Sequence, residues 1–168
     1  MSTIAYQGKY FAVCLDESGT EFVDSGDDEV LIVPVTSEGE VILTIEPSAA
    51  FGEETVILPG GIVEQGEEHT ETASRELQEE VGYIPGQLDY LGELRPFSKY
   101  LTTRCFVYLA RDLIPSKQEG DEDYPIQLEY VAMSEFEQLI AVARLLDARV
   151  IAALYMTRHF LQDHLRGL

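Results

Sequence analysis

An acidic segment, residues 61–83, constrains this chain more than any other feature, because it holds seven carboxylates and a single basic residue, Arg75. Residues 68–81 contain neither proline nor glycine. Apolar residues recur there every four positions, at Ala73, Leu77 and Val81. Gly82 follows directly, as a residue that ends a helix does. The pattern predicts a helix from Glu68 to Val81 with one apolar stripe that faces a core.

Three glutamates of this helix, Glu76, Glu79 and Glu80, stand at positions i, i+3 and i+4, so their side chains converge on one patch away from the stripe. Such a patch is ordinarily a solvated acidic face. A cluster of carboxylate oxygens is also what a hard cation such as Mg²⁺ or Mn²⁺ binds. The helix alone leaves these two interpretations equally open. The Pro-Gly-Gly turn at 59–61 favours the second, because glycine lets the backbone approach a ligand closely.

The whole segment resembles the Nudix box, G-x5-E-x7-R-E-U-x-E-E-x-G-U, where U is a bulky apolar residue. The matching positions are Gly61, Glu67, Arg75, Glu76, Leu77, Glu79, Glu80, Gly82 and Tyr83. Seven of them demand one particular residue type, so a chance match is very rare. The resemblance is to the Nudix hydrolases, metal-dependent enzymes that cleave a diphosphate linkage in a nucleoside-diphosphate compound. It implies an α+β fold, an α/β/α sandwich with a mixed central β-sheet.

The rest of the sequence agrees with one such domain over residues 1–168. Short β-type runs separated by turn signals precede the acidic helix, and further runs follow it. The predicted strands are Lys9–Leu15, Val30–Val35, Val41–Ile45, Thr55–Leu58, Gln87–Leu94, Arg104–Ala110 and Ile126–Val131. The run at 30–35 is apolar throughout, which is typical of a central strand buried on both faces. Two helices are expected to close the chain, at Glu135–Ala143 and after Asp147.

The resemblance also implies roles for single residues. Glu76, Glu79, Glu80 and the backbone carbonyl of Gly60 would bind the cation, Mg²⁺ or Mn²⁺. Gly61, Glu67 and Arg75 would support the box. Glu79 and Glu80 are candidate catalytic residues, and so is Glu122, because some members of the family take their general base from a loop after the box. Whether a box glutamate, Glu119 or Glu122 acts as the base stays open, since a solvated loop explains the acidic run 119–123 equally well.

Beyond the box, the chain is similar to the branch that acts on ADP-ribose and related ADP compounds, including dinucleotides and NADH. In that branch Arg104, and with it Arg95, would contact the substrate's phosphates; a surface salt bridge is the plain alternative. Ile45 and Thr55 depart from the branch, which usually has arginine and glutamate there, so the base preference stays open. The alternatives are hydrolysis of oxidised nucleoside triphosphates or nucleotide sugars, and a non-catalytic domain that senses a nucleotide or acts as a scaffold.

Charge and cysteine content restrict the partners. The 31 acidic and 11 basic residues give a formal net charge of −20, which disfavours nucleic acid and anionic membrane surfaces as partners. A small anionic substrate remains compatible if a cation lies between it and the protein. Cys14 and Cys105 lie in apolar runs, as buried free thiols of a cytoplasmic protein do. Members of the branch commonly form homodimers, and the aromatic residues of segment 1–28 are suited to such an interface.

Overall fold

The computed structural model describes residues 2–120 and 124–166. The strands are β1 (Thr3–Gln7), β2 (Ala12–Leu15), β3 (Glu21–Asp24), β4 (Glu29–Pro34), β5 (Glu40–Ser48), β6 (Glu53–Ile57), β7 (Gly60–Ile62), β8 (Tyr83–Leu94), β9 (Cys105–Pro115) and β10 (Gln127–Ala132). The helices are α1 (His69–Glu76), the π-helical turn Leu77–Val81, α2 (Phe136–Ala141) and α3 (Ala148–Arg166). No helix in these described parts is both long enough and apolar enough to cross a membrane.

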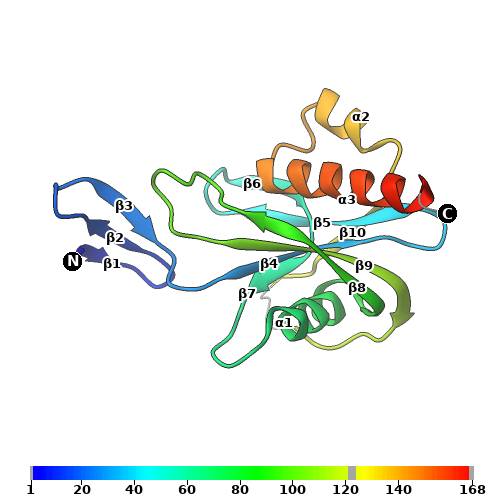
Figure 1. The fold of residues 1–168 in the computed structure, drawn as a ribbon, viewed down its shortest axis with the longest axis horizontal. Helices are drawn as coiled ribbons and strands as arrows, with labels where there is room; N and C mark the ends of the chain where they lie inside the picture. Colours follow the sequence, from blue (N-terminus) through cyan, green and yellow to red (C-terminus); the bar gives the residue numbers. More distant parts are fainter. Residues whose placement is uncertain (1, 121–123, 167–168) are drawn as a thin grey trace.

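Two sheets form the body of the molecule (Figure 1). One has the order β7-β4-β9-β8, and within it β4 and β9 run parallel while the other neighbours are antiparallel. The other has the order β10-β5-β6 and is antiparallel. The prediction of a mixed sheet is therefore confirmed. β4 lies between two neighbours, and Val30, Ile32 and Val33 have no exposed surface, as its apolar sequence predicts.

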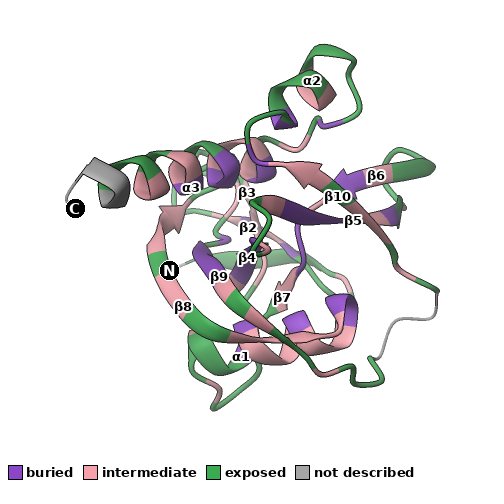
Figure 2. Ribbon diagram, turned by 90° about the vertical axis from the view of Figure 1, so that its right-hand side faces the viewer, coloured by how far each residue is buried: buried purple, intermediate pink, exposed green. Residues whose placement is uncertain are grey.

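Helices cover both faces of this body (Figures 1 and 2). On one face α1 packs its apolar stripe, Ala73 with Leu77 and Val81 of the next turn, against Val30, Ile32 and Phe106. On the other face α3 packs Val150, Ala153 and Leu154 against a cluster that includes Val33 and Val107. Because the side chains of a strand alternate between faces, β4 and β9 contribute to both cores. This arrangement is the expected layered α+β fold.

The acidic helix differs from the prediction in its last turn. The α-helical part ends at Glu76, and Leu77–Val81 form a single π-helical turn. Its closing bond runs from the Gly82 N–H to the Leu77 carbonyl at 3.0 Å, and Gly82 has a φ of 88°. A π turn has one more residue per hydrogen-bonded ring than an α turn, so it changes the directions of the side chains within it. Glu79 and Glu80 lie in this turn.

The N-terminal strands form a separate antiparallel sheet, β1-β2-β3, that projects from the body (Figure 1). The strand predicted at Lys9–Leu15 begins only at Ala12, because the chain turns at Gly8, whose N–H donates to the Phe11 carbonyl at 2.8 Å. Large apolar side chains of this region remain exposed: Ile4, Tyr6, Tyr10 and Phe11. A bridge between Val23 and Leu101 connects its last strand to the body, and the Thr102 hydroxyl adds a hydrogen bond to Asp24 at 2.7 Å.

Candidate active site

The loop before α1 is fastened to the helix by a carboxylate–guanidinium pair. Glu68 and Glu71 form a capping box that begins the helix. One turn further on, Arg75 donates from Nε to Glu67 Oε1 at 3.0 Å and from Nη2 to Glu67 Oε2 at 3.1 Å. These bonds, together with one from the Thr72 hydroxyl, lower the pKa of Glu67 to about 2. Glu67 is therefore a permanent anion at neutral pH, and it fixes the plane of the guanidinium.

The remaining nitrogen of the same guanidinium faces two of the predicted metal ligands. Arg75 Nη1 lies 2.8 Å from Glu76 Oε1 and 3.2 Å from Glu79 Oε2. The hydrogen bonds that Arg75 donates to Glu67, followed by the nearby charge of Glu76, raise the pKa of Arg75. The arginine thus offsets part of the repulsion between carboxylates that the sequence places four residues apart or closer.

Glu80 lies deeper than the other two and is 7% exposed. Its Oε2 accepts a hydrogen bond from the Gly60 N–H at 3.1 Å. The pairing of β7 with β4, Leu31 opposite Gly60 and Val30 opposite Gly61, places this turn beneath the helix. A Cβ atom on Gly60 would lie 2.2 Å from the Val30 carbonyl oxygen, so this close approach of two backbones requires glycine, and a Cβ atom on Gly61 would displace the Glu76 carboxylate.

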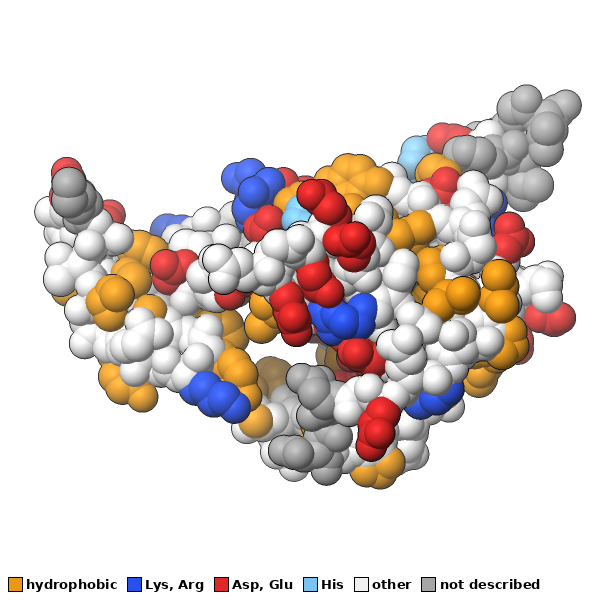
Figure 3. Space-filling view, turned by 90° about the horizontal axis from the view of Figure 1, so that it is seen from below, with side chains coloured by type: hydrophobic (Ala, Val, Ile, Leu, Met, Phe, Trp, Pro, Cys, Tyr) orange, Lys and Arg blue, Asp and Glu red, His pale blue; other side chains and the backbone are white. Residues whose placement is uncertain are grey.

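The three glutamates open onto a cavity of about 300 Å³. Its other walls come from a segment far along the chain: Lys117, Gln118, Glu119, Gly120, Tyr124, Pro125 and Ile126. The Lys117 ammonium donates to the Glu79 carbonyl, and the Gln118 N–H donates to the Gln78 carbonyl at 3.2 Å, which fastens this segment to the π turn. Figure 3 shows acidic side chains gathered beside a hollow on the α1 side of the molecule.

The donor set suits a hard cation, because every candidate ligand is an oxygen. Among residues 2–120 and 124–166, no three His, Cys, Asp or Glu side chains already form a metal-binding group. The contacts above give the physical reason: Arg75 holds Glu76 and Glu79, while the Gly60 N–H holds Glu80. A carboxylate can accept a hydrogen bond on one oxygen and bind a cation through the other, so a cation would need a change of side-chain rotamer rather than the loss of these donors.

The other predicted site residues lie elsewhere. Arg104 pairs with Glu93 at 3.0 Å and lies 3.9 Å from Asp28, and Arg95 pairs with Glu93 at 2.7 Å. Neither arginine lines the glutamate cavity, so their role in phosphate binding stays a prediction. Glu122 lies outside the described residues, and its role as a base stays a prediction too.

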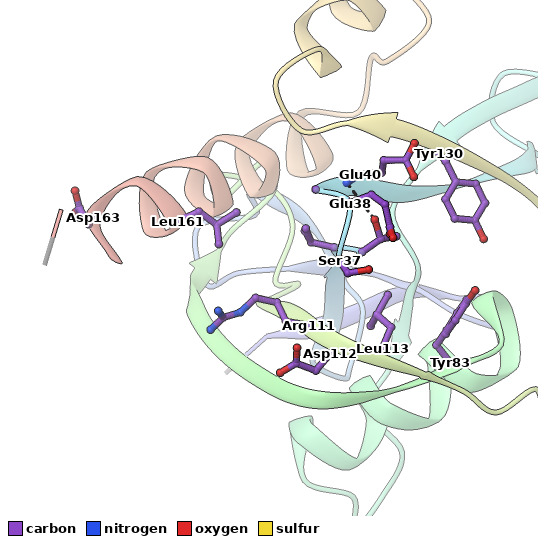
Figure 4. Close-up of a pocket in the computed structure, with 13 residues that line it drawn as sticks. Ser37, Glu38, Glu40, Tyr83, Arg111, Asp112, Leu113, Tyr130, Leu161 and Asp163 are labelled. Carbon is purple, nitrogen blue, oxygen red and sulfur yellow. Dashed lines mark hydrogen bonds between the residues drawn. The ribbon is translucent and has the colours of Figure 1, made fainter. Parts of the chain in front are cut away.

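A larger cavity of about 1200 Å³ lies where the two sheets diverge (Figure 4). Tyr83 and Tyr130 face it from β8 and β10, and Arg111 and Asp112 face it from β9. It contains none of the box glutamates. The volume of a cavity therefore does not identify the candidate active site in this structure. The arrangement of the box carboxylates identifies it.

Comparisons with known proteins agree with this geometry. A model of the NUDIX domain family matches residues 27–154, and the chain therefore belongs to the Nudix family. It is similar to the ADP compounds hydrolase NudE of Escherichia coli (strain K12), with 29% identity over 137 residues, 80% of this chain and 72% of the relative. It is also similar to the ADP-ribose pyrophosphatase of Bacillus subtilis (strain 168), with 29% identity over 74% of this chain and 69% of the relative.

A third relative is the methanol dehydrogenase activator of Bacillus methanolicus, with 28% identity over 74% of this chain and 68% of the relative. Among solved structures, the crystal structure of an ADP compounds hydrolase superposes with a TM-score of 0.85 at 25% identity, and the match covers 98% of this chain and 93% of that one. The predictions of the Nudix fold and of a Nudix hydrolase are confirmed.

Sequence reasoning missed Lys117 and Tyr124 as parts of the cavity. Lys117 contacts a backbone carbonyl 38 residues before it in the chain. No motif marks either residue, because their positions depend on how β9 and β10 return to the box helix.

Proposed function

We propose that this protein hydrolyses the diphosphate linkage of ADP-ribose or related ADP compounds, including dinucleotides and NADH. The observation that carries the proposal is the box itself: three glutamates around one cavity, beside the Gly60-Gly61 turn. The names of the relatives, an ADP compounds hydrolase and an ADP-ribose pyrophosphatase, support the substrate class.

A further cavity supports a substrate that carries a group on each side of its diphosphate. Gly61 borders a space of about 410 Å³ on the side of the N-terminal sheet, lined also by Tyr10, Phe11, Thr103 and Arg149. Because the same turn also bonds through the Gly60 N–H to Glu80 of the glutamate cavity, a diphosphate at the turn would have a space near each end. A nucleoside triphosphate has only one such group.

Glu76, Glu79, Glu80 and the Gly60 carbonyl would hold Mg²⁺, with Mn²⁺ as a possible substitute. When bound, the cation neutralises the diphosphate and lowers the pKa of a water molecule toward neutrality. Arg75 and Glu67 keep the carboxylates oriented toward the cavity. A carboxylate accepts the proton of the attacking water, and the candidates are Glu79, Glu80 and Glu122.

A substrate panel tests the proposal. Phosphate release after phosphatase coupling would be measured for ADP-ribose, diadenosine polyphosphates, NADH, nucleotide sugars and oxidised dGTP, with Mg²⁺ and with EDTA. We expect ADP-ribose or a dinucleotide to exceed the triphosphate in kcat/KM by at least about tenfold, the discrimination that roughly 1.4 kcal/mol provides. EDTA should abolish turnover. Turnover of oxidised dGTP alone would contradict the ADP-compound assignment, and silence across the panel with folded protein would favour a binding module.

The proposed working form is a cytoplasmic homodimer in which the N-terminal sheet forms the interface. Every residue of β1 is exposed, and Ile4, Tyr6, Tyr10 and Phe11 present apolar surface of the kind that interfaces bury. The two free, buried cysteines suit a reducing compartment. The net charge of −20 opposes binding to nucleic acid or membranes. Sedimentation velocity would contradict the dimer if only monomer were found at micromolar concentration.

A further inference from the structure

A buried carboxylate, Glu46, is hydrogen-bonded to a side chain of the glutamate cavity and is not among the proposed metal ligands. Glu46 lies near the end of β5 and is 8% exposed. Its Oε1 accepts a hydrogen bond from the Thr44 hydroxyl at 2.6 Å, and Thr44 is fully buried. Its Oε2 accepts one from the Tyr124 hydroxyl at 2.9 Å. Burying a charged group is costly unless both oxygens are satisfied, so the hydroxyl of Tyr124 is part of what makes this position tolerable.

Tyr124 belongs to the wall of the catalytic cavity. It lines the same space as Glu76, Glu79 and Glu80, and it stands three residues before β10. β10 pairs with β5 so that Gln127 lies opposite Ile45, which brings the segment before β10 beside the end of β5. The hydrogen bond between the two side chains therefore sets the position of the phenol relative to the box glutamates.

The direction of this bond determines what the phenol can recognise. A phenol has one hydrogen, whereas an ionised carboxylate can only accept. The hydrogen of Tyr124 is directed to Glu46, so its oxygen meets other groups as an acceptor. An acceptor at this place recognises a donor, and the donors that a diphosphate compound carries nearest to its phosphates are the hydroxyl groups of the adjoining sugar.

We propose that Tyr124 binds a hydroxyl group of the sugar attached to the diphosphate at the end away from the adenosine, and that Glu46 is the positioning residue that makes Tyr124 an acceptor. This inference rests on the proposed function. It names the part of the substrate that would enter the glutamate cavity. The cavity volume of about 300 Å³ is small for a ligand site, so it takes a sugar with its phosphates rather than a whole nucleoside diphosphate.

Two conservative variants separate this role from a structural one. Tyr124→Phe removes the hydroxyl and keeps the ring. Glu46→Gln keeps the shape, but one carboxylate oxygen becomes an NH2 donor. The new NH2 group either leaves the Thr44 hydroxyl without an acceptor or reverses the direction of the hydrogen bond to Tyr124. With ADP-ribose as substrate, each variant should raise KM about tenfold while kcat stays within about threefold, as expected for the loss of one hydrogen bond to the substrate. The KM of the double variant should not exceed the higher KM of the two single variants, because both substitutions remove the same interaction.

A matched pair elsewhere supplies the control. The Tyr155 hydroxyl donates to Glu137 Oε1 at 2.7 Å on the α2–α3 side of the molecule, outside the catalytic cavity. Tyr155→Phe should leave KM unchanged. A second control changes the substrate: the methyl ester of ADP lacks the second sugar, so Tyr124→Phe should not alter its KM.

The outcomes are distinguishable. If the parent protein hydrolyses ADP-ribose but Tyr124→Phe leaves KM within twofold, the role of Tyr124 is refuted and the proposed function stands. An equal rise in KM for the methyl ester would also refute sugar recognition. If the parent shows no EDTA-sensitive turnover, both proposals fall. Should Glu46→Gln lower the unfolding midpoint sharply, Tyr124→Phe with both substrates still decides the matter.

Discussion

Replacing Glu80 by glutamine is expected to lower kcat by about 10³-fold while the protein remains folded. Glu80 is the most buried of the three box glutamates, and it faces the turn that holds Gly60. Glutamine keeps the shape and the oxygen that accepts from the Gly60 N–H, but it removes the negative charge that a cation needs. A loss of this size corresponds to about 4 kcal/mol of transition-state stabilisation, the scale of one catalytic electrostatic interaction.

The measurement is steady-state turnover of ADP-ribose with saturating Mg²⁺, beside thermal unfolding of the same sample. Glu71→Gln is the matched control, because Glu71 lies on the same helix, is exposed, and caps it by accepting from the Glu68 N–H at 3.0 Å. Glutamine serves that capping role as well, so this control should keep parental activity. If Glu80→Gln turned over within threefold of the parent, Glu80 would not be a metal ligand.

The convergence of the box glutamates was predictable, since it depends on residues close in sequence. Spacings of three and four residues bring side chains together on any helix, and the stripe of Ala73, Leu77 and Val81 fixes which face is buried. The sequence did not reveal the π turn at Leu77–Val81. Whether a helix widens by one residue depends on the packing at its end, here on Gly82 and the Lys117 side chain beside it.

The rest of the cavity was beyond sequence reasoning for the same reason. Glu46 and Tyr124 are 78 residues apart, and only the pairing of β5 with β10 brings them together. A tyrosine in an acidic loop has no local signature of a binding residue. The three-stranded N-terminal sheet was recognised only in part, because β1 is fully exposed and lacks the alternation that marks a half-buried strand.

Replacing Arg149 by methionine is expected to destabilise the fold by about 2 kcal/mol, between the values for an exposed and a fully buried ion pair, because this pair is partly buried. Arg149 donates to Glu29 on β4 and to both oxygens of Asp147, which caps α3, so it joins the central sheet to the last helix. The side chains of Arg149 and Glu29 are 29% and 21% exposed. Chemical denaturation of parent and variant at neutral pH would measure the difference.

The matched control is another arginine with two bonds to one carboxylate, but on the surface. Arg144 pairs with Glu129 at 3.0 and 2.7 Å, and its side chain is 48% exposed. Arg144→Met should cost no more than about 1 kcal/mol. An equal loss of unfolding free energy in the two variants would show that burial does not determine how much these ion pairs stabilise the fold.

The loss of stability in Arg149→Met should also depend on pH. The direction of this dependence follows from the pKa values of Glu29 and Asp147. Burial raises the pKa of Glu29 even though the charge of Arg149 acts to lower it. Burial also acts to raise the pKa of Asp147, but hydrogen bonds from Arg149 outweigh it and lower that pKa. Without Arg149 both folded-state pKa values rise, so the folded variant binds protons more tightly than its unfolded chain, and acid then stabilises it relative to neutral pH.

The deficit of Arg149→Met should therefore shrink as the pH falls toward the ordinary pKa of glutamate, about 4.3. Adding Glu29→Gln should recover part of the lost stability at neutral pH, because it removes one of the two carboxylate charges that no longer pair with Arg149. A deficit that stayed constant with pH and was unaffected by Glu29→Gln would mean that Arg149 acts through the packing of its aliphatic stem rather than through its charge.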